Sequence, residues 1–306
     1  MPSGYDQPLY LLPFDHRNSY VSSMFHFKFP LDAAQQAKVE DSKQLIYEGF
    51  LAAALQGIPK QSAGVLVDEA FGARILRDAR ERGYVTAASV EQSGSHEFHF
   101  EYGEEFAAHI EAVDATFVKV LVRYNPADDA EMNRRQAERL ERLSDYCLGK
   151  GRLLMFELLV PATDEQLKSV KGDGAAYDLQ LRPQLMCDAI TALQDAGVEP
   201  AVWKIEGLDR REDCERVVAA TRRGGRAHVS CIVLGRGADE QKVIDWLETA
   251  AQVDGFIGFA VGRTSFFDAV ADYEAGKVSR AEAAQRIGGQ YRKWVEVFEK
   301  AARARA

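Results

Sequence analysis

A lysine stands inside a short apolar stretch, "AVWKIEGLDR", at residues 201–210. Lys204 lies between Trp203 and Ile205, and Glu206 follows it two positions later. Lysine is seldom fully buried, because removing its ammonium group from water is costly. A lysine placed where a core residue is expected therefore indicates a functional role for that lysine.

Other apolar stretches carry charges at alternate positions. Successive side chains of a β-strand point to opposite faces. In "TFVKVLVRY" (116–124), Lys119 and Arg123 share one face and the three valines share the other. In "RLLMFELLV" (152–160), Glu157 lies on the face opposite its two neighbours. We expect the charged faces to point inward, toward one another.

More charges follow the first two apolar stretches. Asp15 and Arg17 share a face, whereas Asp68 and Glu69 fall on opposite faces. Ion pairs that stabilise a core are the alternative interpretation. Buried ion pairs return little net stability, however. The convergence of two lysines, an arginine and several carboxylates therefore favours a functional site.

Such a set of residues suits amine chemistry. A lysine in a desolvated site beside another cation loses its proton more easily and can attack a carbonyl carbon to form a Schiff base. Lys204 is the candidate nucleophile, and Lys119 is the neighbouring charge. Glu157 could shuttle protons during carbinolamine dehydration and carbon–carbon cleavage. This chemistry requires neither a metal nor a cofactor.

Two glycine-containing turns precede helical patterns near the end of the chain, in "LGRGA" and "VGRTSF". Loop amides and helix N-termini bind anions, and an arginine adds bidentate hydrogen bonds to a phosphate. We expect a phosphate site at Gly235, Arg236, Gly262 and Arg263. With the lysine, this predicts a class I aldolase acting on a phosphorylated ketose.

The elements that must position these residues alternate along the chain. Eight apolar stretches have strand length, and amphipathic helical patterns separate them. This alternation predicts a parallel sheet, and eight units match a (β/α)8 TIM barrel, whose active sites lie at the carboxyl ends of the strands. The expected strands cover 9–14, 64–68, 84–90, 116–124, 152–160, 200–206, 228–235 and 255–262.

An open doubly wound sheet is the alternative fold, but no phosphate-binding glycine motif follows an early strand. No linker divides the sequence, so we expect one domain over residues 1–306. An extra helix closes the chain, and its Trp294 and Phe298 could form a subunit interface or cap the barrel. A homo-oligomer is therefore one expectation.

Composition limits the classes of partner. The chain has 306 residues, 46% of them hydrophobic, and a formal net charge of -9. An acidic protein lacks the basic patch of a nucleic-acid-binding surface. We see no signal peptide and no apolar stretch long enough to span a membrane. The four cysteines are scattered, as in a reducing cytoplasm, which is the expected location.

The sequence resembles the class I tagatose-1,6-bisphosphate aldolase family in "FVKVLVRYNPADDAEMNRRQAERLERLSDYC", "RLLMFELLVP", "VWKIEG" and "VGRTSF". It is still more similar to the C-terminal domain fused to bacterial 5-dehydro-2-deoxygluconokinases, in "FDHRNSY", "VDEAFG" and "SVEQSG". That resemblance implies cleavage of 6-phospho-5-dehydro-2-deoxygluconate into dihydroxyacetone phosphate and malonate semialdehyde.

The resemblance also implies roles for individual residues. Lys204 would form the Schiff base, Glu157 would move protons, and Lys119 would tune Lys204 and hold a substrate oxygen. Asp15 would bind substrate hydroxyls, with Arg17 as an orienting cation. The remaining residues of the predicted substrate and phosphate site are Glu69, Gln92, Arg123, Gly235, Arg236, Gly262 and Arg263.

Two positions depart from the family pattern. Gln92 stands where the family has a lysine, and Arg236 occupies a turn that has a serine in the tagatose enzymes. An extra arginine would suit the sulfonate of a sulfosugar phosphate. Alternative functions are therefore an aldolase or transaldolase for another ketose phosphate or a sulfosugar, and a sugar-phosphate sensor without catalysis.

Histidines provide two weaker signals. In "HEFHFE", His96, His99 and Glu101 have a spacing that could hold the metal of a class II aldolase, but a polar loop is the favoured interpretation. His16 could transfer protons, although strand alternation directs it away from Asp15.

Overall fold

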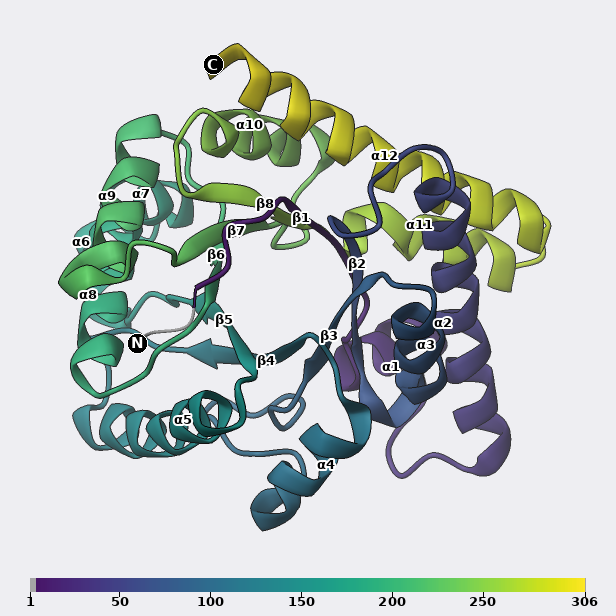
Figure 1. Ribbon diagram of the computed structural model, residues 1–306, viewed down its shortest axis with the longest axis horizontal. Coiled ribbons are helices and arrows are strands. Elements are labelled where there is room, and N and C mark those ends of the chain that lie inside the picture. The colour runs from purple at the N-terminus through teal and green to yellow at the C-terminus, as the bar shows by residue number, and fades with distance from the viewer. Residues whose placement is uncertain (1–3, 306) are drawn as a thin grey trace.

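Eight parallel strands close into a barrel, which confirms the predicted (β/α)8 fold. The structure, a computed structural model, describes residues 4–305. The strands follow one another around the ring in chain order, and β1 pairs with β8 to close it (Figure 1). The strands are β1 (Leu9–Pro13), β2 (Ala63–Asp68), β3 (Val85–Ser89), β4 (Phe117–Arg123), β5 (Leu153–Leu159), β6 (Val202–Glu206), β7 (Ser230–Leu234) and β8 (Phe256–Ala260).

Helices surround the barrel and connect each strand to the next. Three helices rather than one lie between β5 and β6, and two lie between β1 and β2. The α-helices are α1 (Asn18–Phe25), α2 (Ala33–Ala54), α3 (Glu69–Glu81), α4 (Phe106–Val113), α5 (Ala130–Lys150), α6 (Asp164–Ser169), α7 (Gly174–Gln180), α8 (Arg182–Asp195), α9 (Arg211–Arg222), α10 (Glu240–Ala251), α11 (Arg263–Glu274) and α12 (Arg280–Arg305).

Strand alternation divides the buried residues into two cores. The outward side chains pack against the helices, as Val118, Val120 and Trp203 do. The inward side chains fill the lower part of the barrel, where Phe117, Met155 and other residues form a separate apolar cluster. The charged residues lie directly above this inner cluster. Lys119 and Lys204 are the next inward residues after the cluster on their strands, toward the carboxyl ends.

Local capping fixes where several helices begin. The side chain of Asp129 accepts a hydrogen bond from the backbone N–H of Met132 at the start of α5, at 2.8 Å. Asp68 does the same for the N–H of Phe71 at the start of α3, at 2.9 Å. An acidic cap satisfies amides that have no partner within the helix. Helix α3 therefore begins directly after β2.

The last helix, α12, runs across the outside of the barrel and packs against α2, α10 and α11 (Figure 1). Its Trp294 and Phe298 are buried. The indole N–H of Trp294 donates to Ser265 Oγ at 2.9 Å. These two aromatic residues therefore pack within this chain. Within residues 4–305, every helix is too short or too polar to cross a membrane.

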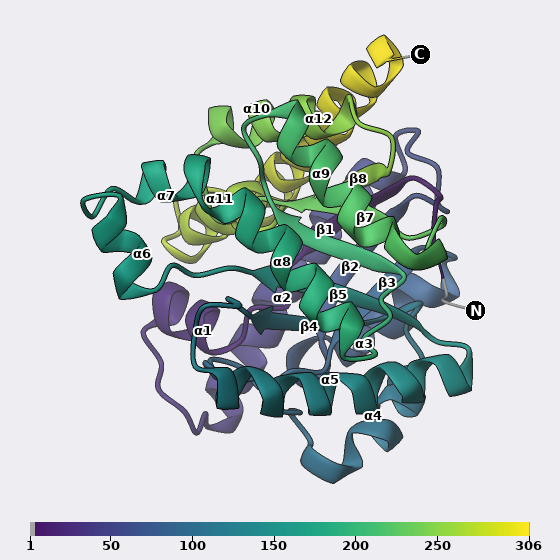
Figure 2. The same ribbon diagram turned by 90° about the vertical axis from the view of Figure 1, so that its left-hand side faces the viewer.

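Figure 2 shows the barrel from the side. The short helices α1, α6 and α7 lie at the end of the barrel opposite the N-terminus. These helices follow β1 and β5, so they mark the end at which the strands finish.

Candidate active site

A cavity of about 350 Å³ opens at the carboxyl ends of the strands. Every strand except β2 contributes to its lining, either from its last residues or from the loop that follows. This is the end at which barrel enzymes hold their active sites. The structure brings to it all of the predicted site residues except Glu69, namely Asp15, Arg17, Gln92, Lys119, Arg123, Glu157, Lys204, Gly235, Arg236, Gly262 and Arg263.

Strand register places the two lysines and the glutamate together. Glu157 on β5 is the direct partner of Lys204 on β6. Lys119 lies on the adjacent strand β4, one inward position nearer the barrel floor than Glu157. All three side chains point inward, as strand alternation predicted, and all are buried.

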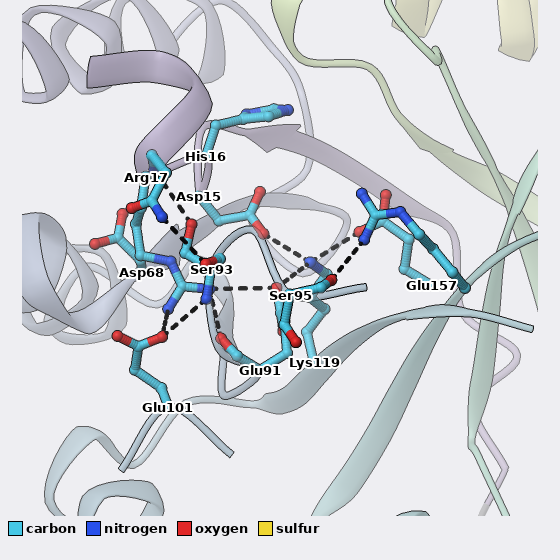
Figure 3. Close-up of polar contacts among 12 residues, drawn as sticks. Asp15, His16, Arg17, Asp68, Glu91, Ser93, Ser95, Glu101, Lys119 and Glu157 are labelled. Carbon is cyan, nitrogen blue, oxygen red and sulfur yellow. Dashed lines mark hydrogen bonds and ion pairs between the residues drawn. The ribbon is translucent and has the colours of Figure 1, made fainter. Parts of the chain in front are cut away.

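Lys119 lies at the centre of a cluster of charges (Figure 3). Its ammonium contacts Asp15 at 2.8 Å, Glu91 at 2.9 Å and Glu157 at 2.8 Å. The side chain of Lys119 is 1% exposed, so no solvent competes for these contacts. We call Asp15, Glu91, Lys119, Glu157 and Lys204 the lysine–carboxylate cluster.

Burial and charge oppose each other in this cluster. Burial alone would raise the pKa of Asp15, but the charge and hydrogen bond of Lys119, together with His16 and Lys204, outweigh it, and the pKa lies far below its ordinary value. Burial also opposes the charge of Glu157, yet Lys119 and Lys204 together hold its pKa below the usual range. For Glu91, burial is the larger influence and the pKa is raised. Asp15 and Glu157 are therefore carboxylates at neutral pH and can accept protons.

The carboxylates act in the opposite direction on the central amine. Burial alone would lower the pKa of Lys119, but Asp15, Glu157 and Glu91 raise it above the ordinary value. Lys119 thus remains an ammonium group at any physiological pH. It supplies a fixed positive charge beside Lys204.

Lys204 contacts the second oxygen of Glu157. The expectation of an apolar setting for this lysine is wrong. Its chain neighbours Trp203 and Ile205 point to the helix layer, where they are completely buried, while Lys204 itself faces the charged cavity. A carboxylate in contact with the amine can take its proton, which provides an alternative to desolvation for activating the amine.

Arg17 anchors the loop after β3. Its guanidinium donates to the backbone oxygen of Glu91 at 2.6 Å and to Glu101 Oε2 at 2.9 Å. Glu101 also accepts from the backbone N–H of Ser93 at 3.0 Å. These contacts hold Glu91 against Lys119 (Figure 3). Arg17 lines the cavity, but its charge is largely satisfied by the protein.

Arg263 and Gly262 form the opposite wall, after β8. Arg263 is exposed, begins helix α11, and has no carboxylate partner among residues 4–305. A Cβ atom on Gly262 would lie 2.4 Å from the backbone oxygen of Pro13, so β1 and this turn approach too closely for any other residue. The turn therefore presents the start of α11 and an unpaired cation to the cavity, as an anion site requires.

Arg236 has a different setting from Arg263. Its guanidinium contacts Asp178 at 2.6 Å and Glu206 at 3.1 Å. The backbone of Arg236 has a φ of 51°, a left-handed conformation that favours glycine. Both neighbouring glycines, Gly235 and Gly237, line the cavity. Carboxylates thus neutralise Arg236, and its attraction for a phosphate is weaker than that of Arg263.

Arg123, at the end of β4, donates to the backbone oxygen of Ser95 at 3.1 Å. It too has no carboxylate partner within the described residues. Strands β4 and β8 lie four places apart in an eight-stranded ring, so Arg123 and Arg263 occupy opposite sides of the cavity. The cavity therefore has an unpaired cation at each side.

With this geometry in place, comparison with known proteins assigns a family. A family described as an uncharacterized protein conserved in bacteria, DUF2090, matches residues 4–302. The chain belongs to the DUF2090 family. No curated protein sequence matches it.

Solved structures share the fold of this DUF2090 protein. A fructose-bisphosphate aldolase from Plasmodium falciparum has a TM-score of 0.63 at 12% identity, and the match covers 94% of this chain and 89% of the aldolase chain. An archaeal fructose 1,6-bisphosphate aldolase has a TM-score of 0.56 at 12% identity, covering 96% and 95%. A Schiff-base-forming fructose-1,6-bisphosphate aldolase has a TM-score of 0.56 at 13% identity, covering 95% and 94%. At these identities the likeness concerns the fold.

Glu69 does not belong to the cavity, contrary to the prediction. It is the first residue of helix α3, and its carboxylate contacts His109 of α4 at 2.9 Å. Strand β2 ends at Asp68, whose carboxylate forms a fully buried ion pair with Lys43 and caps α3. The helix begins so early that the alternation of β2 no longer determines the direction of Glu69.

Sequence reasoning missed the role of Glu91 and undervalued His16. Strand alternation continued from Ser89 would have placed Glu91 inward, so a signal was present.

His16 lines the cavity together with Asp15, although strand alternation predicted that it points elsewhere. The alternation no longer applies at His16, because β1 ends at Pro13. Its ring nitrogen Nδ1 is buried without a hydrogen-bond partner. Burial lowers the pKa of His16 to about 4, with Asp15 opposing the change and Arg263 adding to it.

The residues proposed for a metal do not come together. Glu101 pairs with Arg17, and residues 4–305 hold no group of three His, Cys, Asp or Glu side chains arranged to bind a metal ion. His96 is exposed at the cavity rim, in the loop after β3.

Proposed function

We propose that this protein is a class I aldolase that cleaves a phosphorylated keto-sugar through a Schiff base on Lys204. The observation that carries the proposal is the contact of one carboxylate, Glu157, with both Lys204 and the permanently charged Lys119 at the base of the cavity. A nucleophilic amine requires a nearby proton acceptor. Glu157 is in contact with Lys204 and can take this role, and Lys119 supplies a fixed positive charge beside it.

Imine formation uses Glu157 twice. Its Oε1 takes a proton from the ammonium of Lys204, and the neutral amine attacks the ketone carbon of the substrate. The same carboxyl group then returns a proton to the hydroxyl of the carbinolamine, which leaves as water. The lowered pKa of Glu157 makes it a good proton donor once it has been protonated.

Cleavage follows from the imine. The protonated imine withdraws electrons from the adjacent carbon–carbon bond, which breaks when a carboxylate of the lysine–carboxylate cluster removes the proton from the hydroxyl beyond that bond. An aldehyde leaves, and an enamine remains on Lys204. Asp15 and Glu157 are both ionised at neutral pH and line the cavity beside Lys204.

The proposed substrate carries an anionic group at each end. Arg263 and the start of α11 would hold a phosphate, and Arg123 would hold a second anion on the other side. A substrate with a terminal phosphate and a terminal carboxylate fits this arrangement. We therefore favour 6-phospho-5-dehydro-2-deoxygluconate, which the sequence resemblance implies, with dihydroxyacetone phosphate and malonate semialdehyde as products. Other ketose phosphates and sulfosugar phosphates are the competing substrates.

A product assay tests the proposal. The protein is incubated with 6-phospho-5-dehydro-2-deoxygluconate, fructose 1,6-bisphosphate, tagatose 1,6-bisphosphate and a sulfofructose phosphate, and release of dihydroxyacetone phosphate is followed. We expect the keto-sugar acid to be cleaved fastest and Lys204→Met to cleave none of them. Binding of these sugars without any release of product would indicate a sensor in place of an enzyme.

A further inference from the structure

Cleavage of a sugar through Lys204 leaves a carbon that must gain a proton. The enamine that remains on the lysine cannot hydrolyse until its nucleophilic carbon is protonated. The protonating group has to line the cavity and has to be able to change its protonation state during turnover.

The carboxylates of the cluster are poorly suited to this step. Asp15, Glu91 and Glu157 each lie within 2.9 Å of the Lys119 ammonium. Arg17 further engages Glu91. These ion pairs hold the carboxylates against Lys119, and Glu157 also contacts the nitrogen of Lys204.

His16 is not restrained in this way. Its imidazole makes no side-chain hydrogen bond among residues 4–305, and Nδ1 is shielded from solvent without a partner. The ring lies against Gly262, where a Cβ atom would be 3.5 Å from Cε1, and against the edge of Phe266. It therefore lies beside the turn expected to hold the phosphate. The phosphate-bearing fragment is the one that stays on Lys204.

We propose that His16 transfers the carbon-bound proton of the three-carbon fragment attached to Lys204, an inference that rests on the proposed aldolase function. Figure 3 shows the ring diverging from the Asp15 carboxylate, which instead points to Lys119. The two residues thus face different parts of the cavity. Asp15 serves the charged cluster, and His16 serves the phosphate side.

The step balances as an acid–base exchange. In the cleavage direction, the neutral ring first takes up a proton from solvent, and a ring N–H of the resulting imidazolium gives this proton to the enamine carbon. The carbon–carbon π electrons form the new C–H bond, and the nitrogen lone pair forms the second bond of the C=N iminium. His16 is then neutral again, and water hydrolyses the iminium. In the reverse direction, neutral imidazole removes the same proton.

The resting state of the ring suits the reverse direction. With a pKa of about 4, His16 is a neutral base at physiological pH. The charged groups that act on it are Asp15, Glu157, Lys204 and Arg263, two of each sign. It can therefore start proton exchange on bound dihydroxyacetone phosphate without first losing a proton.

Hydrogen exchange isolates this step. Dihydroxyacetone phosphate is incubated with the protein in D₂O, and loss of one hydrogen from its hydroxymethyl carbon is followed by NMR. In parallel, borohydride traps the imine, and mass spectrometry measures the adduct on Lys204. For His16→Gln we expect exchange at least about 100-fold slower than in the wild type, since general acid–base groups contribute about 10²–10⁴-fold. The yield of the Lys204 adduct should remain within about twofold.

His228→Gln is the control, because that side chain is 80% exposed and lies outside the cavity. This variant should show the wild-type rate of hydrogen exchange and the wild-type yield of the Lys204 adduct.

His16→Asn is measured beside His16→Gln, and circular dichroism selects the variant that retains the wild-type fold. Wild-type exchange in that variant would overturn the role of His16 and leave the aldolase proposal standing. Loss of the Lys204 adduct in that variant would also overturn the proposed role of His16, because it would show that His16 is needed for imine formation itself. Absence of the adduct in the wild type would instead refute the aldolase proposal.

Discussion

The ammonium of Lys119 lies 2.8 Å from Oε2 of Glu157, and the other oxygen of this carboxylate contacts Lys204. One carboxylate thus bridges a lysine whose charge is permanent and a lysine that lines the cavity at the expected point of attack. The bridge links side chains of β4, β5 and β6, in addition to the backbone pairing of these strands. In the proposed mechanism, the two lysines have different tasks.

Replacing the bridge should slow proton transfer without preventing imine formation. In Glu157→Gln, the amide retains the shape of the side chain but cannot accept a proton from Lys204. We expect kcat to fall by about 10²–10⁴-fold, the range of a lost acid–base group. Borohydride should still trap the adduct, more slowly, in rapid-quench experiments. An unchanged kcat would remove Glu157 from the mechanism.

Lys119→Met should reverse the pH dependence of stability. In the wild type, the lowered pKa values of Asp15 and Glu157 stabilise the fold above their ordinary values of 3.8 and 4.5, and this contribution is lost as the pH falls. The raised pKa of Lys119 stabilises the fold below its ordinary value of 10.5. Without the lysine, the buried Asp15 loses its cationic contact, while Glu91 and Glu157 keep only Arg17 and Lys204, and the fold loses about 3–5 kcal/mol at pH 7.

Protonation should then restore part of that loss. We expect the Tm of Lys119→Met to rise as the pH falls from 7 to 5, while the wild-type Tm stays level or declines. Thermal unfolding followed by circular dichroism across this range measures both curves. Parallel curves would show that Lys119 does not neutralise the carboxylates.

Arg263→Ala should mainly weaken binding of phosphorylated substrates. A charge-assisted hydrogen bond contributes about 1.5–3 kcal/mol, so KM should rise about tenfold to a hundredfold. Arg236→Ala should raise KM much less, because Asp178 and Glu206 already neutralise that guanidinium. Steady-state kinetics with phosphorylated and unphosphorylated ketoses compares the two variants. Equal effects of both substitutions would contradict the assignment of the phosphate to Arg263.

Arg123→Ala should affect the other half of the substrate. In the condensation direction, KM for malonate semialdehyde should rise about tenfold or more, because its carboxylate loses its partner. Exchange of dihydroxyacetone phosphate with D₂O should be unchanged, since that molecule occupies the opposite side. Impaired exchange in this variant would show that Arg123 acts on the phosphate-bearing fragment.

The sequence was most informative where strands are regular. Alternation correctly placed Lys119, Glu157 and Lys204 inward, because their strands continue past them and the pleat fixes the direction of each side chain. The same reasoning failed for His16 and Glu69, which follow the last strand residue and obey a loop and a helix start, respectively.

Contacts between distant segments could not be predicted in the same way. The pairing of Arg17 with Glu91 and Glu101 joins loops that are 74 and 84 residues apart, and no local pattern encodes it. The apolar neighbours of Lys204 suggested a dry setting, although they face the helices and leave the lysine among charges. Residues adjacent in sequence on a strand point to opposite faces of the sheet, so the chain neighbours of Lys204 do not describe its surroundings. Those surroundings depend on the side chains of the neighbouring strands.

Reductive trapping, with mapping of the modified residue, shows whether Lys204 forms the Schiff base. The wild-type protein is treated with borohydride and dihydroxyacetone phosphate, digested, and analysed by mass spectrometry. We expect a single reduced adduct on the peptide that contains Lys204, loss of activity in proportion to labelling, and no adduct in Lys204→Met. An adduct on Lys119, or full activity after treatment with no adduct at all, would contradict the assignment of the Schiff base to Lys204.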